Sequence, residues 1–319
     1  MHAPAKSTRS PAQEAWRRFR NDRGAIMFLA LSLAFAAAAA CAQLIELIDG
    51  PPFVYELTLA EQGLPFEEHA SPPSTSHWLA WAGTTSQGKS VLLRAFHGTK
   101  VAFVVGLCGA GLAVLIGTTL GLLAGFFGRW VDEVIVYIYS TVASIPYLLL
   151  MLALAFIVRQ GPVAGLYRQL PFSDYLSIGL FNIVLVVGAT SWVTLCRLIR
   201  AEVKKVRNLD YVLAAQALGA SRTRVLIRHV LPNVTHLVLI NFSLTFVTAI
   251  KSEVILTFLG VGVDREPSWG QMIADAKSEL MQGIWWPLLV SGGLLFLLTL
   301  SVNIVADALR DALDPRLRH

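Results

Sequence analysis

The hydrophobic residues of this chain lie in long blocks, and most polar residues are confined to the stretches between the blocks. Most blocks reach the roughly 20 residues that a helix needs to cross the apolar core of a bilayer. The pattern therefore predicts an all-α membrane protein with six transmembrane helices. We expect the spans near residues 25–45, 101–127, 134–158, 178–198, 234–262 and 286–305, the third interrupted by Pro146. The second span is rich in glycine, and such small residues let helices approach closely in lipid.

The distribution of Lys and Arg orients these spans. Basic residues are densest before the first span and at 197–233, between the fourth and fifth spans. Such stretches remain in the cytoplasm, so we expect both termini to be cytoplasmic. The predicted organisation is a cytoplasmic segment 1–23, a first transmembrane helix 24–46, an external loop 47–99, a transmembrane core 100–309 with a cytoplasmic loop at 204–233, and a cytoplasmic tail 310–319.

The composition agrees with a membrane protein. The chain is 55% hydrophobic and 15% charged, with a mean hydropathy of +0.59, whereas soluble domains carry about 25% charged residues. The net charge of +5 could suit nucleic acid, but the basic residues lie at the ends of apolar blocks. We therefore expect membrane lipid and no nucleic acid as a partner. Cys41, Cys108 and Cys196 lie within apolar blocks and indicate packing residues rather than a disulfide framework or a metal site.

Residues 83–90 read GTTSQGKS and match the phosphate-binding pattern G-x-x-x-x-G-K-[ST]. A true P-loop follows a strand and opens a helix, so that backbone N–H groups cradle the phosphates. The match lies in the predicted external loop, without alternating strands and helices around it. We interpret it as a turn leading towards the second span. An ATP-hydrolysing enzyme that uses this segment is the alternative.

The stretch DYVLAAQALGASRTRVLIRHVLPN, residues 210–233, predicts two short helices on the cytoplasmic side. Asp210 is placed to cap the first helix by accepting a hydrogen bond from a backbone N–H. One stripe of that helix, with small residues at its middle, comprises Tyr211, Ala214, Ala215 and Leu218. Because small residues permit close approach of another helix, we expect this face to dock a partner.

The second half of the stretch carries its own signals. Gly219 suits a left-handed residue after the first helix, and Ser221 can cap the second helix. Arg224 and Arg228 share one face of the second helix, and Leu231-Pro232 is expected to end it. The stretch therefore predicts a capped, basic helical hairpin. The alternative is an ordinary surface hairpin whose arginines lie among lipid headgroups.

This stretch resembles the cytoplasmic "EAA" loop of ABC importer permeases, with Ala214-Ala215, Gly219 and Leu231-Pro232 at the family's spacing. The fuller string is similar to the C-type permease subunit of dipeptide and oligopeptide importers. The resemblance covers nearly the whole chain from the first span onward. Its other segments are LGLLAGFFGRWVD (120–132), TFLGVGV (257–263), PSWGQM (267–272) and DALRDALDPR (307–316).

The resemblance implies a type I ABC importer permease in the bacterial inner membrane, which moves dipeptides, oligopeptides or a related solute by alternating access. Nickel chelates and glutathione are the family's variant substrates. The implied partners are a second homologous permease, two cytoplasmic ATPase subunits that bind ATP and Mg, and an external solute-binding protein. This chain would hold no catalytic site, cofactor or metal, and the hairpin would couple it to the ATPases.

Three departures from the family pattern change these expectations. Leu213 replaces the acidic residue that names the loop, so docking would depend on small-residue packing, the Gly219 turn and the arginine face. Gly83-Thr84, Gly88-Lys89 and Val91 resemble the family's GTD-x-x-GRD-V segment, but Thr85 and Ser90 replace its acidic residues, which creates the P-loop match. Lys251 stands where an apolar residue is expected in the fifth span.

Ionisable residues inside spans are costly and usually face a bundle interior or a wet cavity. Lys251 and Glu253 are therefore candidates for the translocation path, together with Pro146 in the third span. Residues two apart point about 200° apart on a helix, so we do not expect Lys251 and Glu253 to pair. The alternative for Glu253 is a structural partner or a position near the external interface.

No spacing of histidine, cysteine, serine or acidic residues indicates a catalytic constellation. A channel or secondary transporter that works without ATPase subunits is the remaining alternative, and it would not need the capped hairpin.

Overall fold

A computed structural model of the chain describes residues 16–17, 19–49, 55–64, 70–167, 169 and 177–313. The predicted segment 1–23 lies mostly outside these residues, as do the end of the tail 310–319 and parts of the loop 47–99. Helices make up most of the described chain, in which no strand occurs and two isolated bridges join Thr58 to Lys89 and Thr84 to Ser90. The predicted all-α fold is confirmed.

Five helical segments are long and apolar enough to cross a membrane, and a bent pair of helices brings the number to six if it counts as one span. Each of the five lies over one of the predicted apolar blocks. They are built from α2 (Arg23–Asp49); α3 (Val91–Val104), the π-helical turn η2 (Val105–Gly109) and α4 (Ala110–Phe127); α8 (Ile178–Thr190) and α9 (Trp192–Val206); α11 (Arg222–Val225), the π-helical turn η3 (Leu226–Val230) and α12 (Leu231–Phe258); and α14 (Trp286–Leu313).

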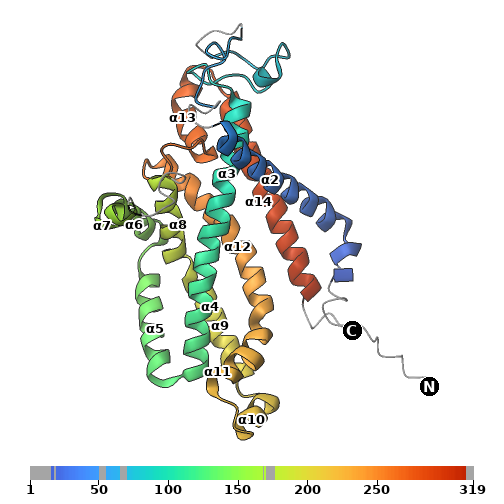
Figure 1. Cartoon of the computed structure of the whole chain (residues 1–319), viewed down its shortest axis with the longest axis vertical. Helices are drawn as coiled ribbons and strands as arrows, with labels where there is room; N and C mark the ends of the chain where they lie inside the picture. The colour runs from blue at the N-terminus through green and yellow to red at the C-terminus, as the bar shows by residue number, and fades with distance from the viewer. Residues whose placement is uncertain are drawn as a thin grey trace, which may run out of the picture.

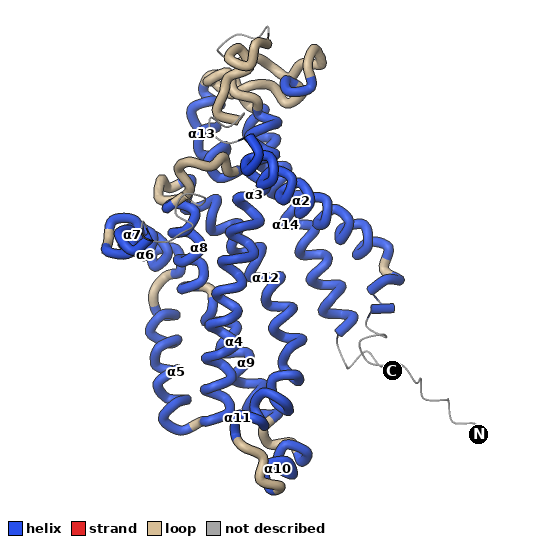
Figure 2. Tube along the Cα trace, viewed as in Figure 1, coloured by secondary structure: helices blue, strands red, loops and turns tan. Residues whose placement is uncertain are grey.

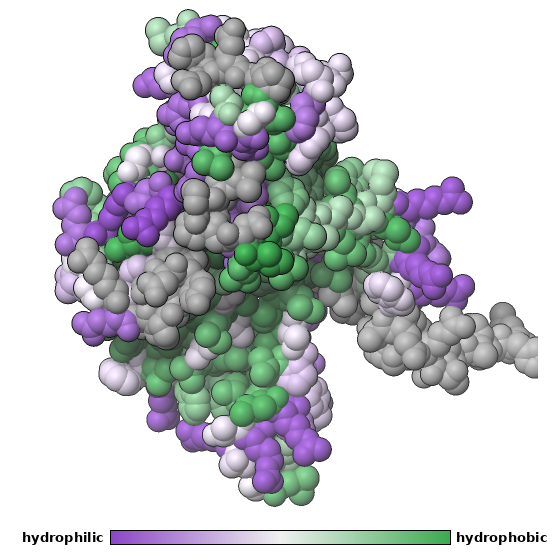
Figure 3. Space-filling view, turned by 45° about the horizontal axis from the view of Figure 1, so that its top comes forward, coloured by the Kyte–Doolittle hydropathy of each residue, from purple (hydrophilic) through white to green (hydrophobic). Residues whose placement is uncertain are grey.

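The helices of the bundle run side by side along the long axis of the molecule (Figure 1). Loops lie mostly at the two ends (Figure 2). One end carries α10 (Asp210–Ala217) and α11, and the other carries α13 (Trp269–Met281) and the short 3-10 helix η1 (Trp78–Ala80). Apolar side chains cover much of the middle of the molecule, and hydrophilic ones gather towards these ends (Figure 3).

The helix over the second apolar block begins earlier than predicted, at Val91, inside the stretch expected to be an external loop. Ser90 explains the early start. Its side chain accepts a hydrogen bond from the backbone N–H of Leu93, which satisfies one of the free donors at the helix N-terminus. The Ser90 hydroxyl also donates to the Leu79 carbonyl, at 2.6 Å, and so ties this start to the external loop.

The third predicted span, 134–158, is not one helix. α5 (Arg129–Ser144) and α6 (Tyr147–Gln160) meet at a bend of 96°. Ile145 at the corner has an extended backbone, with φ −90° and ψ 132°. Proline disfavours the helical conformation of the preceding residue and supplies no N–H, so Pro146 turns the chain. α6 and the short α7 (Pro162–Tyr167) consequently lie beside the bundle (Figure 1).

The tightest helix contact joins α4 to α9. Gly117, Gly121 and Gly125 recur every fourth residue, so they share one face of α4. A Cβ at Gly117 would lie 2.7 Å from the Trp192 carbonyl oxygen, and one at Gly121 would lie 2.8 Å from the Cys196 carbonyl oxygen. The glycines therefore let the two backbones touch, and this packing stabilises helix pairs in lipid. The close approach expected from the glycine-rich second span is confirmed.

Charged groups fasten the same helices at their hairpin end. Asp132, in the first turn of α5, accepts hydrogen bonds from Arg200 and, at 2.7 Å, from the Lys204 ammonium on α9. Arg207 donates to the Gly125 carbonyl, at 2.9 Å, near the C-terminus of α4. These bonds join α4, α5 and α9 just before the chain enters the hairpin.

We predict that Gly121→Leu prevents normal packing of α4 on α9, because every leucine rotamer begins with the Cβ clash. Overpacking typically costs about 1–3 kcal/mol, and here the backbone itself obstructs relief. The yield of monodisperse protein extracted from membranes measures the effect. Gly111→Leu on the same helix is the control, since a Cβ at Gly111 meets nothing within 4 Å. Equal yields from the two variants would contradict the prediction.

Candidate functional site

Residues 210–233 form a hairpin whose inner face is held by a column of valines. Val212 from α10 and Val225 from α11 are fully buried against Val203 of α9 and Val234 of α12. Fully burying a valine stabilises by about 1.5–3 kcal/mol. Two short helices that would be marginal alone are thereby fixed to the ends of two long ones.

The turn between the two short helices has the predicted geometry. Gly219 has φ +83°, the left-handed conformation that follows a helix, and the Ser221 side chain accepts from the Arg224 N–H at 3.4 Å. These two details are confirmed. The predicted cap at Asp210 is wrong. Leu209 is instead the N-cap residue of α10, with an extended backbone and no side-chain cap. Its N–H donates to the Val206 carbonyl in the turn that leaves α9, so α10 begins one residue earlier than predicted. Asp210 lies in the first turn of α10, where its negative charge interacts favourably with the positive end of the helix dipole.

The predicted end of the second helix at Leu231-Pro232 is also wrong. The helical path continues from α11 through η3 into α12, and Pro232 lies in the first turn of α12. The π-helical turn explains this, since it widens the helix where proline would otherwise clash with the preceding turn. The Asn233 side-chain amide donates to the His229 carbonyl in the same region. The hairpin is therefore continuous with the fifth span.

The outer face of the hairpin is apolar and basic. Leu218 is 89% exposed, and Tyr211 and Leu213 are about half exposed. Ala214, Arg224 and Arg228 are exposed as well, and Ala215 is partly buried. The predicted stripe thus lies at the surface, and so does the leucine that replaces the family's acidic residue.

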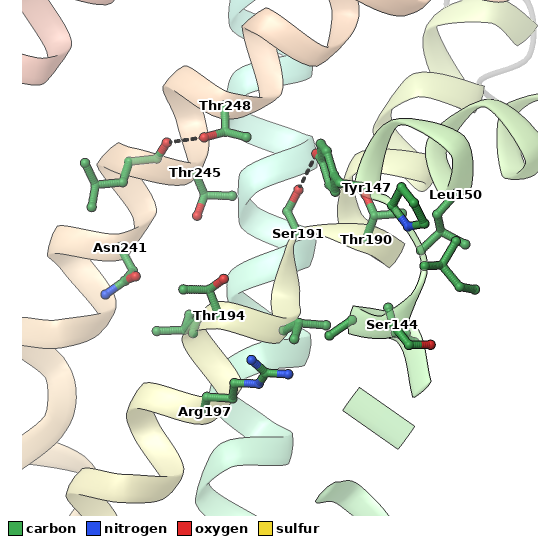
Figure 4. Close-up of a pocket in the computed structure, with 17 residues that line it drawn as sticks. Ser144, Tyr147, Leu150, Thr190, Ser191, Thr194, Arg197, Asn241, Thr245 and Thr248 are labelled. Carbon is green, nitrogen blue, oxygen red and sulfur yellow. Dashed lines mark hydrogen bonds between the residues drawn. The ribbon is translucent and has the colours of Figure 1, made fainter. Parts of the chain in front are cut away.

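A cavity of about 660 Å³ opens between the α5–α6 corner, α9 and α12. Figure 4 shows its polar side chains, which come from all three walls. The Tyr147 hydroxyl forms a hydrogen bond with Ser191, at 3.1 Å, and so links α6 to the turn between α8 and α9. The polar residues that line the cavity are Ser144, Tyr147, Thr190, Ser191, Thr194, Arg197, Asn241, Thr245 and Thr248.

Comparison with known proteins gives the family. Residues 117–319 match the family profile "Binding-protein-dependent transport system inner membrane component". Residues 10–72 match the profile "N-terminal TM domain of oligopeptide transport permease C". The chain belongs to this permease family. It is an ABC importer permease of the dipeptide and oligopeptide type, and the resemblance seen in its motifs is confirmed.

Individual relatives cover nearly the whole permease. It is 31% identical to the dipeptide transport system permease protein of Bacillus subtilis (strain 168), over 97% of this chain and 87% of that protein. It is 34% identical to the oligopeptide transport system permease protein of the same organism, over 77% and 74%. The glutathione transport system permease protein of Pectobacterium atrosepticum is 30% identical, over 98% and 94%.

One solved structure, titled as a crystal structure of an amino acid ABC transporter with histidines, shares 13% identity with the permease. It has a TM-score of 0.46 and covers 68% of this chain and 93% of that one.

The segment that matches the P-loop pattern forms a tight hairpin in the permease. The Thr85 N–H donates to the Lys89 carbonyl and the Gly88 N–H to the Thr85 carbonyl, both at 2.9 Å. The Ser86 N–H donates to the Glu279 carboxylate at 3.0 Å. These N–H groups thus already have protein acceptors, one of them a carboxylate where a phosphate would need to lie.

The three candidates for the translocation path lie in different surroundings. Pro146 lines the cavity, whereas Lys251 and Glu253 are not among the described residues that line it. Lys251 is exposed. Glu253 is 2% exposed and accepts from the Thr257 hydroxyl at 3.0 Å, and a Cβ at Gly270 of α13 would lie 3.0 Å from its carboxylate. No ion pair joins Lys251 to Glu253 in the described chain. A path role for either residue stays a prediction.

Sequence reasoning missed most of the cavity wall. Asn241, Thr245 and Thr248 recur at helical spacing in the fifth span, and this polar stripe was the available signal. In the sequence, Arg197 belongs to a basic stretch that indicates only the topology. The valine column under the hairpin was not predicted, because the sequence does not show which residues a valine on a short helix will contact.

We predict that Val212→Ala loosens the hairpin without unfolding the bundle, because it removes methyl groups from the one fully buried side chain of α10. A large-to-small change of this size costs roughly 1–3 kcal/mol. Amide hydrogen exchange over 210–225 should accelerate by about tenfold or more. Leu218→Ala, at a position 89% exposed, is the control and should leave exchange unchanged. Unchanged exchange in Val212→Ala would show that the hairpin is held by other contacts.

Proposed function

We propose that this permease moves dipeptides or oligopeptides across the bacterial cytoplasmic membrane by alternating access, driven by separate ATPase subunits. It would pair with a second, homologous permease, giving a heterodimer, and receive substrate from an external solute-binding protein. Both termini would be cytoplasmic. ATP and Mg would be bound by the ATPase subunits, so this chain would act without a cofactor or metal of its own.

The observation that carries this proposal is the attachment of the hairpin. Its inner face packs on α9 and α12, and its outer face presents apolar and basic groups to a partner. The exposed set comprises Tyr211, Leu213 and Leu218 together with Arg224 and Arg228, and aromatic residues and arginine are enriched in protein interfaces.

The same two helices line the cavity. Thr194 and Arg197 come from α9, and Asn241, Thr245 and Thr248 come from α12. A force on the hairpin would therefore move two walls of the cavity relative to the α5–α6 corner. A ligand or nucleotide shifts a conformational equilibrium only if it interacts differently with the two states. The hairpin offers the ATPases such a differential contact.

The cavity in one permease supports the need for a second. It is an open depression between elements of a single chain rather than an enclosed pore, and a homologous permease would supply the opposite wall. Relatives about 30% identical are named as dipeptide and oligopeptide permeases, which supports peptides as the substrate class. A relative named as a glutathione permease makes glutathione the alternative substrate.

We predict that Leu218→Asp weakens association with the ATPase subunits by about tenfold or more, because it places a carboxylate in an apolar interface. Pull-down of the ATPases with tagged permease from detergent extracts measures this. Met281→Asp is the matched control, since Met281 is equally exposed at 89% but lies at the end of α13 on the opposite side of the molecule. Equal recovery of the ATPases with both variants would refute docking at the hairpin.

We also predict that Gly219→Pro uncouples ATP hydrolysis from uptake while the protein still inserts. Proline cannot reach φ +83°, so the two short helices would change their relative direction. Proteoliposomes of the whole complex would hydrolyse ATP with uptake reduced about tenfold or more. Gly219→Asn is the control, because asparagine tolerates the left-handed region and its Cβ would meet nothing within 4 Å. Uptake retained in Gly219→Pro would contradict the coupling role.

A further inference from the structure

Arg197 differs from every other residue that lines the cavity. Among the described lining residues it alone carries a charge, and the others are apolar side chains, hydroxyl groups and one amide. It lies inside the span Ile178–Val206 and is exposed. Charged side chains within membrane helices are costly and usually face the bundle interior or a wet cavity. Such a residue requires a partner or a function.

Three neighbouring cations in and beside the spans have partners. Arg200, about one turn further along α9, pairs with Asp132, and Lys100 on α3 pairs with Glu46. Arg159, after the corner, pairs with Asp264 at 2.8 Å. No described carboxylate forms an ion pair with Arg197. Its charge is therefore available to something outside this chain.

The guanidinium is held in one direction. It lies over the Tyr139 ring, 4.8 Å from the centroid, and that ring is buried on α5. Figure 4 shows the side chain extending from α9 towards the corner that carries Ser144. Stacking on an aromatic face uses the face of the guanidinium and leaves its edge of N–H donors free. The free N–H donors of this guanidinium can bind a planar anion such as a carboxylate.

Three other polar side chains of the wall offer acceptors to a solute. The Thr248 hydroxyl donates to the Leu244 carbonyl at 3.0 Å, and the Asn241 side-chain nitrogen donates to the Leu237 carbonyl at 2.9 Å. The Ser144 hydroxyl donates to the Thr141 carbonyl at 2.7 Å. These bonds hold the three side chains on their own helices and leave the oxygens of Thr248, Asn241 and Ser144 available as acceptors. Such oxygens suit ammonium and amide N–H groups, whereas Arg197 is the one cation among the described lining residues that a carboxylate can pair with.

We infer that Arg197 binds the carboxylate of the substrate during its passage, while the acceptors of α12 face the substrate's N–H groups. This inference rests on the proposed transport of peptides, whose free C-terminus always supplies a carboxylate whatever the side chains are. Arginine and carboxylate form a paired, charge-assisted hydrogen bond. The site would distinguish a peptide from its amide.

The test uses the complete complex in proteoliposomes, with both permeases, the ATPases and the solute-binding protein. The substrates are one peptide as the free acid and as the C-terminal amide, chosen so that the binding protein binds both, and each is supplied at saturation. Hydrogen bonds to charged groups are stronger than those between neutral groups. Arg197→Gln should therefore slow uptake of the free acid by about tenfold or more and change uptake of the amide by less than about twofold.

Two further variants separate substrate binding from other roles. Arg197→Lys should retain most uptake of the free acid, because the charge remains. Lys205→Gln removes a positive charge from the same helix, at a side chain 73% exposed and paired only with Glu202, and should leave both substrates unaffected. Basal ATP hydrolysis should stay unchanged in Lys205→Gln.

Three results would overturn the inference. Arg197→Gln could slow the acid and the amide equally, leave both unchanged, or prevent assembly with the second permease. The last would show that Arg197 pairs with a carboxylate of that subunit. Failure of the wild-type complex to take up either peptide is a separate result, which would contradict the proposed substrate class itself.

Discussion

The contact between α4 and α9 is the constraint on which the other features of this permease depend. In lipid, helices gain little from hydrophobic burial against one another, so they associate where small residues let backbones approach. Gly117, Gly121 and Gly125 provide that approach along one face of α4. Because α9 is held there, its end positions the hairpin, and its middle forms one wall of the cavity.

The hairpin illustrates a division between buried and exposed apolar residues. Valines on its inner face bind it to α9 and α12, whereas Tyr211, Leu213 and Leu218 remain at the surface. Since burial of the inner face already stabilises the two short helices, the outer face is free to serve a partner. The loss of the family's acidic residue at Leu213 fits this arrangement, because an exposed leucine there enlarges an apolar surface.

The two prolines show where local rules held and where they did not. Pro146 was expected to interrupt a span, and it turns the chain by 96° because the preceding residue is pushed into an extended conformation. Pro232 was expected to end a helix, yet the helix continues through it. The difference lies in the preceding residues, which adopt a π-helical turn at 226–230 and accommodate the ring. The presence of a proline alone does not predict whether the residues before it form a π-helical turn.

The sequence by itself determined the all-α membrane fold, the placement of the apolar spans, the glycine face of α4, the Gly219 turn, the Ser221 cap and the permease family. Each of these depends on local chemistry: span length, the absence of a Cβ, a left-handed backbone, a side-chain acceptor, or a motif. The tertiary structure alone decided which valines hold the hairpin, how sharply the chain turns at Pro146, and that Arg197 lies over Tyr139 in a cavity wall shared with α12. The valine contacts and the Arg197 site join residues distant in the chain, and an isolated side chain in a sequence does not show which helix it will meet.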